Sequence, residues 1–371
     1  MEFSVSKADL VRELNLSQGV VEKKTTIPIL SNVLFEAEGD ALTLTTTDLE
    51  LGIRSKCSAK IAKGGAGTIP ARRLLDYVRL LPDTDVQIKF GDNYWATLVC
   101  GRSRTRIAGM SRESFPELPE MPPPLAEIPV RALASMIVRT IFAISSEESR
   151  FNLNGALLIV QSTGLTMVAT DSHRLPMVHQ AIELPEIASS YRALLPRKAM
   201  SEILKLSQET GAEAKLKFSG DENHLFFQLG DRLLLSRKLT GNFPDYERVL
   251  PKEHARSVVL GREELRGALE RVAQFSDERS RAVRVKMAGG EMKIFSSLSE
   301  TGDSEESISA DYDGPSVEMG FNAQYMLDFL RASSEEQISF YFKDAGSAGE
   351  LRPAGDSLDY NYRYVIMPMR I

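Results

Sequence analysis

The residue types that could do chemistry gather in the stretch ATDSHRL, where Asp171, Ser172 and His173 are consecutive. An acid, a hydroxyl and an imidazole are the parts of a hydrolytic relay, in which histidine takes the proton of the nucleophile. Neighbouring residues of a strand point to opposite faces, so three consecutive side chains cannot form that relay among themselves. We therefore expect a binding or structural role for His173. A hydrolase that uses Asp171 and His173 is the less favoured alternative.

Other catalytic signatures are missing from the sequence. It has no GxSxG, Walker, HExxH or dinucleotide-binding motif. Cys57 and Cys100 form no CxxC pair, so they do not suggest a zinc site, and we expect two free thiols in a reducing cytosol. Asp48 precedes Asp171 by 123 residues in a similar phrase, which favours a shared role at a turn or strand end. We expect no catalytic residue, no metal and no cofactor.

The elements that must position these residues are repeated. A helix-like phrase occurs three times, and Pro70, Pro196 and Asn322 mark its copies at an interval of 126 residues. In the first copy, Ala71, Leu74, Leu75, Val78 and Leu81 fall on one helix face. A fixed period of this kind indicates a repeated structural unit.

Each third of the chain has the same order of patterns: a helix, an alternating hairpin, the repeated helix and further strands. The opening helices are expected at Val5–Leu16, Val130–Ile144 and Arg262–Phe275. The hairpins are expected to turn at Gly39-Asp40, Gly164 and Gly289-Gly290. A proline-rich connection at Leu118–Pro129 follows the first third, and Asn242–Ala255 separates the second third from the last. We predict an α+β fold of three domains, residues 1–124, 125–251 and 252–371, each with two helices packed on antiparallel sheets.

The charge is acidic overall but unevenly distributed. The 371 residues carry a net charge of −6, which argues against a surface that grips nucleic acid everywhere. The first two copies of the repeated helix nevertheless carry cations that could track phosphates without reading bases: Arg72, Arg73, Arg79, Arg197, Lys198 and Lys205. The sequence has no apolar run long enough for a membrane span and begins without a signal-peptide pattern, so we expect a cytoplasmic protein with no membrane partner.

Two segments of opposite charge lie at opposite ends of the chain. Arg102, Arg104 and Arg106 alternate along one predicted strand, and the acidic group is Glu300, Asp303, Glu305 and Glu306. Ile107 and Phe275 are candidates for the apolar part of the same contact. We predict that the first domain of one copy meets the third domain of another, a head-to-tail contact that can close into a ring.

These features, together with several phrases spread along the chain, resemble the bacterial β sliding clamps. The phrases include TIPILSNVLFE, RFNLNGALL, ATDSHRL, FPDYERVLP and the terminal YVIMPMRI. The resemblance covers essentially the whole chain. It implies a homodimeric ring of three-domain subunits that encircles double-stranded DNA without sequence preference and serves as processivity factor of the replicative polymerase. A clamp paralogue with a specialised or inhibitor-resistance role is the alternative.

The resemblance also implies site residues and partners. The implied DNA contacts are Lys24, Arg72, Arg73, Arg150 and Phe151, and Arg197 is added as a further candidate. The implied peptide-binding pocket comprises Leu153, Thr170, His173, Arg174, Leu175, Pro244, Arg248, Val249, Tyr325, Val365, Met367, Pro368, Met369 and Arg370. Ser172 stands where glycine is common in the family.

The implied partners are the polymerase catalytic subunit, the clamp loader, translesion polymerases, mismatch repair proteins and ligase. The protein itself would be a non-catalytic subunit of the DNA polymerase III holoenzyme.

Overall fold

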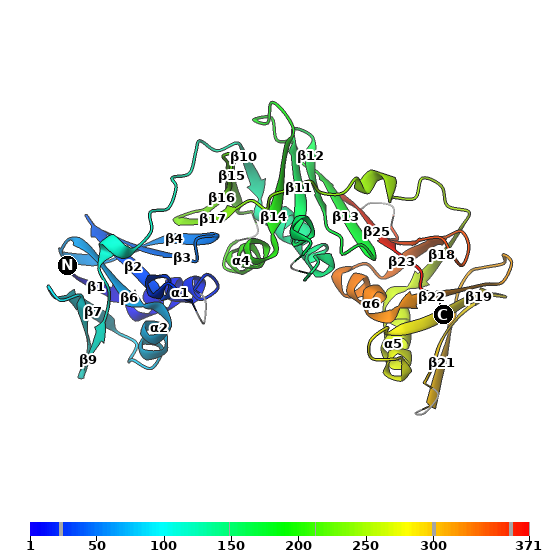
Figure 1. The fold of residues 1–371 in the computed structure, drawn as a ribbon, viewed down its shortest axis with the longest axis horizontal. Coiled ribbons are helices and arrows are strands. Elements are labelled where there is room, and N and C mark those ends of the chain that lie inside the picture. Colours follow the sequence, from blue (N-terminus) through cyan, green and yellow to red (C-terminus); the bar gives the residue numbers. More distant parts are fainter. Residues whose placement is uncertain (22–24, 148, 212, 299–301, 356–358, 371) are drawn as a thin grey trace. The chain divides into compact units, whose positions relative to one another are not determined.

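The computed structural model describes residues 1–21, 25–147, 149–211, 213–298, 302–355 and 359–370 (Figure 1). Its contacts divide the chain into two compact units that are each discontinuous in sequence. Unit 1 consists of Met1–Ala134 and Lys198–Lys238, and unit 2 of Ser135–Arg197 and Leu239–Ile371. Among the described residues, no helix is long and apolar enough to cross a membrane.

Unit 1 contains two antiparallel sheets. The first has the order β5-β1-β7-β8-β9, formed by Lys60–Lys63, Glu2–Ser6, Asp85–Phe90, Trp95–Cys100 and Ser103–Ala108. The second has the order β10-β15-β16-β17-β4-β3-β2-β6, formed by Ala126–Pro129, Lys215–Gly220, His224–Leu229, Arg232–Arg237, Leu51–Ser58, Ala41–Thr47, Asn32–Glu38 and Gly65–Pro70.

Unit 2 repeats the larger sheet and adds a smaller one. The eight-stranded sheet has the order β14-β11-β12-β13-β25-β24-β23-β18, formed by Tyr191–Pro196, Gly155–Gln161, Gly164–Val168, Arg174–Ala181, Tyr360–Ile366, Gly349–Pro353, Gln337–Phe342 and Arg256–Gly261. The four-stranded sheet has the order β21-β20-β19-β22, formed by Gly302–Ser309, Glu291–Leu298, Ala282–Ala288 and Val317–Asn322.

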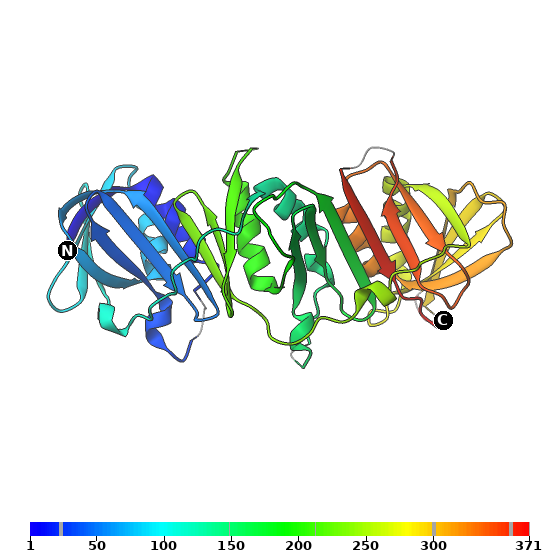
Figure 2. The ribbon, with the colours of Figure 1, turned by 90° about the horizontal axis from the view of Figure 1, so that it is seen from above.

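The two larger sheets match strand for strand. Residues of β2, β3 and β4 correspond to those of β11, β12 and β13 at an offset of 123, and the cross-strand register is the same: Leu34 lies opposite Thr45, as Leu157 lies opposite Val168. Each sheet joins strands from two sequence repeats, through β4 with β17 in one and β13 with β25 in the other. Figure 2 shows the joined strands side by side, blue with light green and green with red.

Helices cover the sheets as pairs. α1 (Lys7–Ser17) packs on α2 (Ala71–Arg79), and α5 (Arg262–Val272) packs on α6 (Ala323–Ala332). The apolar stripe predicted for α2 is buried, with Leu74, Leu75 and Val78 at 0% exposure. The other two helices are α3 (Val130–Val138) and α4 (Arg197–Gln208).

Local sequence sets where the helices start and stop. Ser6 caps α1 by accepting the N–H of Asp9 at 3.1 Å, and Asn322 caps α6 by accepting the N–H of Tyr325 at 3.2 Å. The α-helices predicted at Val130–Ile144 and Arg262–Phe275 are shorter than expected. Both α-helices stop early, and 3₁₀ turns follow at Ile141–Ala143 and Ala273–Phe275.

The predicted hairpins are confirmed. Gly39, Gly164, Gly289 and Gly290 all have positive φ, as the tight turns require. The element order recurs three times along the chain, as the repeat predicted, while the compact units cut across it because each large sheet is shared between neighbouring repeats.

Candidate functional site

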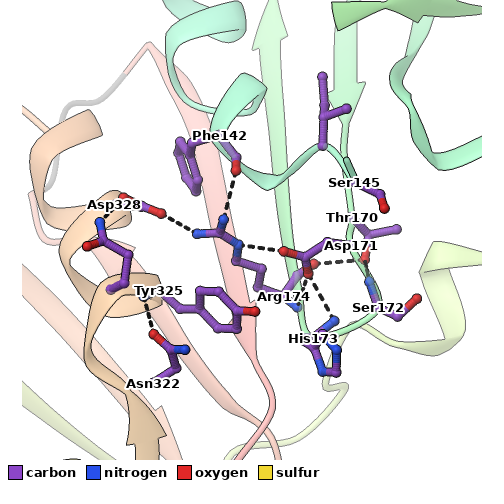
Figure 3. A network of polar contacts seen from close by, with 12 residues as sticks. Phe142, Ser145, Thr170, Asp171, Ser172, His173, Arg174, Asn322, Tyr325 and Asp328 are labelled. Carbon is purple, nitrogen blue, oxygen red and sulfur yellow. Dashed lines mark hydrogen bonds and ion pairs between the residues drawn. The ribbon is translucent and has the colours of Figure 1, made fainter. Parts of the chain in front are cut away.

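The stretch that suggested catalysis is a tight turn between β12 and β13 (Figure 3). Asp171 Oδ1 accepts the backbone N–H groups of His173 at 3.0 Å and Arg174 at 3.1 Å. Thr170 Oγ1 donates to the carbonyl of Arg174 at 2.8 Å and accepts the N–H of Ser172 at 3.1 Å. Asp171 therefore holds the backbone of His173, and its role is to shape the turn.

Unit 1 contains the same turn between β3 and β4. Asp48 Oδ1 accepts the N–H groups of Glu50 and Leu51, and Thr47 Oγ1 donates to the carbonyl of Leu51 at 2.9 Å. The shared turn role predicted for Asp48 and Asp171 is confirmed. Leu49 and Ser172 occupy the same position in the two turns, each with φ of 78°. This left-handed conformation favours glycine, which gives a physical reason for the glycine expected at position 172.

Arg174 joins this turn to helix α6. Its Nε donates to Asp171 Oδ2 at 2.9 Å, one terminal nitrogen pairs with Asp328, and the other donates to the carbonyl of Phe142 at 2.8 Å. Its guanidinium also lies 4.3 Å from the centre of the Tyr325 ring. Burial acts to lower the pKa of Arg174, but the surrounding Tyr364, Asp328 and Asp171 raise it above its usual value. Arg174 is therefore a fixed, charged side chain that links two sequence repeats.

An apolar cluster lies beside the turn. Its buried members are Leu157, Ile159, Val168, Leu175, Leu194, Tyr246 and Val365, and partly buried neighbours such as Met177 and Phe243 pack against it. Val249 and Met367 keep 44% and 45% of their surface exposed. Exposed apolar side chains therefore lie within three residues of cluster members along the chain, an arrangement suited to an apolar ligand.

The C-terminal tail continues along the same region. The Met367 N–H donates to the carbonyl of His173 at 2.9 Å, and the Met369 N–H donates to the carbonyl of Gly320 at 2.8 Å. The His173 and Tyr325 rings stack with centroids 6.4 Å apart. Backbone hydrogen bonds thus hold the tail to the turn and to strand β22, and Arg174 joins the turn to helix α6.

All the predicted pocket residues belong to unit 2. Leu153, Thr170, Arg174, Leu175 and Val365 are buried, and Tyr325, Pro368 and Met369 are half-buried. The exposed members are His173, Pro244, Arg248, Val249, Met367 and Arg370. The sequence did not identify Phe142 and Asp328. Because 154 residues separate Asp328 from Arg174, no local pattern could have connected them.

Removing the Arg174 charge should destabilise unit 2. We expect Arg174→Met to lower the free energy of unfolding by about 3 kcal/mol, because Asp171 and Asp328 would stay partly buried without their cation. A shifted midpoint in urea denaturation measures this. The matched control is Arg248→Met, whose side chain is 86% exposed. Equal midpoints for the two variants would contradict the stabilising role of the Arg174 ion pairs.

The candidate DNA contacts differ in their exposure and in their hydrogen-bond partners. Arg73 on α2 is exposed, and Arg72 is half-buried. Phe151 keeps 67% of its surface exposed. Arg150 pairs with Glu147 at 2.9 Å and donates to Ser172 Oγ at 2.8 Å, and Arg197 donates to the carbonyl of Ile144. Lys24 lies outside the described residues.

Two cations that the sequence grouped with these contacts are paired within the chain. Lys198 bonds with Asp48, and Lys205 pairs with Glu202 at 2.6 Å. Carboxylates within the chain therefore neutralise two of the positive charges that the sequence places on α4.

The two complementary segments lie on edge strands. β9 is at one edge of its sheet and exposes Arg104 and Arg106, while Arg102 is exposed just before the strand begins. β21 is at the edge of the four-stranded sheet and exposes Asp303 and Glu305. Alternation along both strands places the two basic and the two acidic side chains each on one face.

Three further residues predicted for this contact have the following surroundings within the chain. Glu306 lies on the other face of β21 and pairs with Arg271 at 2.7 Å, so its carboxylate is already engaged within the chain. Ile107 is only 4% exposed and belongs to the core of unit 1, whereas Phe275 is half-buried. Glu300 lies outside the described residues.

Nothing in this geometry favours chemistry. Among the described residues no group of His, Cys, Asp or Glu could hold a metal ion. Cys57 and Cys100 are buried and free, as expected, and burial raises the pKa of Cys57 to about 12, so its thiol is unreactive at neutral pH.

Comparisons with known proteins agree with this arrangement. Three family models of the DNA polymerase III beta subunit match: the N-terminal domain at residues 1–119, the central domain at 127–245 and the C-terminal domain at 247–370. The beta sliding clamp of Pseudomonas putida is 36% identical over 374 residues, and that of Caulobacter vibrioides is 35% identical over 384, with all of both chains covered in each case.

Solved structures extend the similarity to the fold. The DNA polymerase sliding clamp of Pseudomonas aeruginosa superposes with a TM-score of 0.92 at 34% identity, over 100% of both chains. That of Bacillus subtilis superposes with a TM-score of 0.93 at 27% identity, over 100% of this chain and 99% of the other. This chain, with its three repeats and shared sheets, therefore belongs to the family of beta sliding clamps, the beta subunits of DNA polymerase III.

Proposed function

We propose that this protein is a cytoplasmic DNA sliding clamp that forms a closed ring of two head-to-tail copies around duplex DNA. One observation carries the proposal: the described residues form two eight-stranded sheets, and a five-stranded and a four-stranded sheet that contain the two parts of a third, with β5 as an extra edge strand. The order β22-β19-β20-β21 corresponds to β14-β11-β12-β13, and β1-β7-β8-β9 corresponds to β18-β23-β24-β25. In both complete sheets the strands equivalent to β21 and β9 are hydrogen-bonded to each other.

Pairing β21 of one copy with β9 of a second copy would complete the missing sheet. Unpaired edges are prone to uncontrolled association, and ring closure leaves neither edge open. If β21 of each copy pairs with β9 of the other, two copies close into a ring-shaped dimer. A contact that depends on two different surfaces of the same chain is head-to-tail by definition.

The repeats also predict the register of this contact. Gly101 and Gly230 are equivalent turn residues, with φ of 55° and 57°, and Asp303 is equivalent to Gly52 in the hairpin before it. In unit 1, Leu235 lies opposite Gly52 and Leu233 opposite Arg54. Transferred to β9 and β21, this register places Arg106 opposite Asp303 and Arg104 opposite Glu305.

The apolar candidates fit the same register. It places Ile107 opposite Gly302, on the buried face. A Cβ added at Gly302 would lie 3.5 Å from the Phe275 ring, so the glycine leaves that ring accessible. We propose that the half-buried Phe275 packs there against the edge of β9 beside Ile107, whose own side chain already lies in the core of unit 1.

DNA would pass through the ring, contacted by Lys24, Arg72, Arg73, Arg150, Phe151 and Arg197. Weak, sequence-independent contacts with phosphates suit a protein that must slide, because topology rather than affinity prevents its escape.

Partners would dock in unit 2. The apolar cluster, with Val249 and Met367 exposed at its border, would take a short peptide segment from the polymerase catalytic subunit, the clamp loader, translesion polymerases, mismatch repair proteins or ligase. Methionine suits a site with several partners because its flexible side chain adapts its shape. The protein would be a non-catalytic subunit of the holoenzyme.

Topological retention tests the function. Protein loaded on nicked circular DNA should co-elute with it in gel filtration at moderate salt and should be lost once the DNA is cut to a linear form, because a ring slides off an end. Linear DNA blocked at both ends by bound protein is the control and should retain it. Equal retention on open linear and circular DNA would refute the sliding ring.

A further inference from the structure

A buried carboxylate lies on the sheet face that carries the apolar cluster of unit 2. Glu350, on β24, is 0% exposed. Cross-strand register places it opposite Val365, a member of the cluster, and places Arg363 opposite Met177, which packs against the cluster. Opposite residues of paired strands point to the same face, so Glu350 and Arg363 lie on the face that carries the proposed peptide pocket.

Three basic groups surround this carboxylate. Arg363 donates through Nε to Oε1 of Glu350 at 2.5 Å and through Nη2 to Oε2 at 2.9 Å. Arg352 Nε also donates to Oε1, at 2.7 Å, and His254 Nε2 lies 3.0 Å from Oε2. Burial acts to raise the pKa of Glu350, but the hydrogen bonds from Arg363 and Arg352 lower it below its usual value. Glu350 is therefore ionised, and it fixes the Arg363 guanidinium.

Arg363 connects this carboxylate to the segment that joins the second repeat to the third. Its Nη2 also donates to the Pro251 carbonyl at 2.8 Å. Earlier in the segment, Tyr246 belongs to the apolar cluster and Leu250 packs against it. The Tyr246 carbonyl accepts the N–H groups of Val249 at 3.0 Å and Leu250 at 3.2 Å. The segment is therefore attached at Tyr246 and at Pro251, and Val249, which is 44% exposed, lies between these attachments.

Unit 1 holds the equivalent segment in a simpler way. The Phe-Pro pair at 115–116 corresponds to that at 243–244, so Pro123 is equivalent to Pro251. Ser219, on β15, donates its hydroxyl to the Pro123 carbonyl at 2.9 Å. In both units a side chain of the larger sheet therefore holds the carbonyl of the equivalent proline.

The buried charges of unit 2 are replaced by apolar residues in unit 1. The matching register of the two sheets makes Phe226 equivalent to Glu350 and Leu233 equivalent to Arg363. Phe226 is 0% exposed, so the fold accommodates an apolar residue at the buried position. Well-packed apolar residues often stabilise a core at least as well as a buried ion pair, so the charges of unit 2 indicate a role beyond stability.

We propose that Glu350 and Arg363 are positioning residues of the peptide pocket. This inference rests on the proposed docking of a partner peptide in unit 2. Glu350 holds the Arg363 guanidinium, Arg363 holds the Pro251 carbonyl, and the segment that ends there is kept against the apolar cluster. Val249, a predicted contact of the peptide, is then fixed before the peptide arrives, so binding requires less ordering of this segment.

Arg363→Met tests this role, because it removes the bond to the Pro251 carbonyl while Glu350 keeps its two other partners. We expect a labelled peptide from the clamp-binding segment of a replicative polymerase to bind roughly five- to tenfold more weakly in fluorescence anisotropy. Hydrogen–deuterium exchange at the Val249 and Leu250 amides, measured without peptide, should accelerate at least tenfold. The amides of β24 should keep their exchange rates.

Two further variants separate positioning from stability. Arg363→Lys should lose less than threefold in affinity, because one nitrogen, Nη2, serves both Glu350 and Pro251, and an ammonium group can do the same. The double variant Glu350→Leu, Arg363→Leu leaves no buried carboxylate without its partner. Its thermal unfolding midpoint should stay close to that of the unmodified protein, while its peptide binding falls roughly five- to tenfold. A role in stability alone would leave binding by this variant unchanged.

Arg284→Met is the matched control. Arg284 also forms an ion pair between strands of unit 2, with Glu318 at 3.2 Å, so its loss should change neither peptide binding nor the exchange of the segment. Normal peptide binding by Arg363→Met, or unchanged exchange at Val249 and Leu250, would overturn the positioning role alone. Failure of the unmodified protein to bind the peptide would instead refute the docking site itself, and with it the pocket that these residues position.

Discussion

Replacing both Arg104 and Arg106 with glutamate should convert the dimer into monomers at concentrations where the unmodified protein is fully dimeric. The proposed register puts these residues directly opposite Glu305 and Asp303, so the double variant would place four carboxylates in two cross-strand pairs. Like charges opposite one another in a sheet are destabilising. We expect the dissociation constant to rise at least a hundredfold, measured by sedimentation velocity over a dilution series.

The complementary change should restore the dimer. Combining the double variant with a chain carrying Asp303→Arg and Glu305→Arg would recreate opposite pairs in inverted order at one of the two contacts, and carrying all four changes in one chain would do so at both. High salt should partly rescue the double variant, because it shortens the range of the repulsion between exposed charges. A double variant that stayed dimeric, or a fourfold variant that stayed monomeric, would reject the register.

An inner strand offers a matched control. Lys215 and Lys217 are exposed at alternate positions of β15, as Arg104 and Arg106 are on β9, but β15 is already paired on both sides. Reversing both lysine charges should leave the dimer intact. The single tryptophan gives a second signal, because the Arg106 guanidinium lies 4.9 Å from the Trp95 ring. Its fluorescence should change as the unmodified dimer is diluted into monomers.

The sequence predicted the repeat well because repeated elements leave local patterns. Helix faces, hairpin glycines and the 126-residue interval are all short-range signals, and they fixed the α+β class and the order of elements. The sharing of sheets between repeats could not be read this way. Whether β4 pairs with β17 depends on contacts between distant segments, which no local periodicity records.

The same limit applied to the site. The turn at Thr170–Arg174 was predictable because Asp48 repeats it, whereas the Arg174 contact with Asp328 needs the fold of unit 2. Strand alternation correctly grouped Arg104 with Arg106. The same alternation separates Glu306 from Glu305, since adjacent residues of a strand face opposite ways, so the acidic run does not form a single cluster.

Deleting Met367–Ile371 should abolish binding of peptides taken from the clamp-binding segment of a replicative polymerase, with a loss of at least a hundredfold. The deletion removes Met367, which follows the cluster residue Val365 by two positions, and the two backbone hydrogen bonds that hold the tail beside His173 and Gly320. β25 would remain complete to Ile366, and the completed sheet of unit 2 would keep its register. Fluorescence anisotropy with a labelled peptide measures the loss, and sedimentation measures the dimer.

The dimer should survive this deletion because the proposed contact between β9 and β21 contains no tail residue. A point variant separates the side chain from the backbone: Met367→Ala should weaken peptide binding about tenfold while keeping the Met367 N–H bond to His173. Val259→Ala is its control, since Val259 is also an apolar side chain of unit 2 with 46% exposure but lies on β18. If the truncated protein bound the peptide normally, the pocket would have to lie elsewhere, and the methionine tail would be only the end of a strand. If the truncated protein lost both peptide binding and the dimer, the tail would also support the ring. Peptide docking and ring closure use separate surfaces only if the dimer persists when the peptide no longer binds.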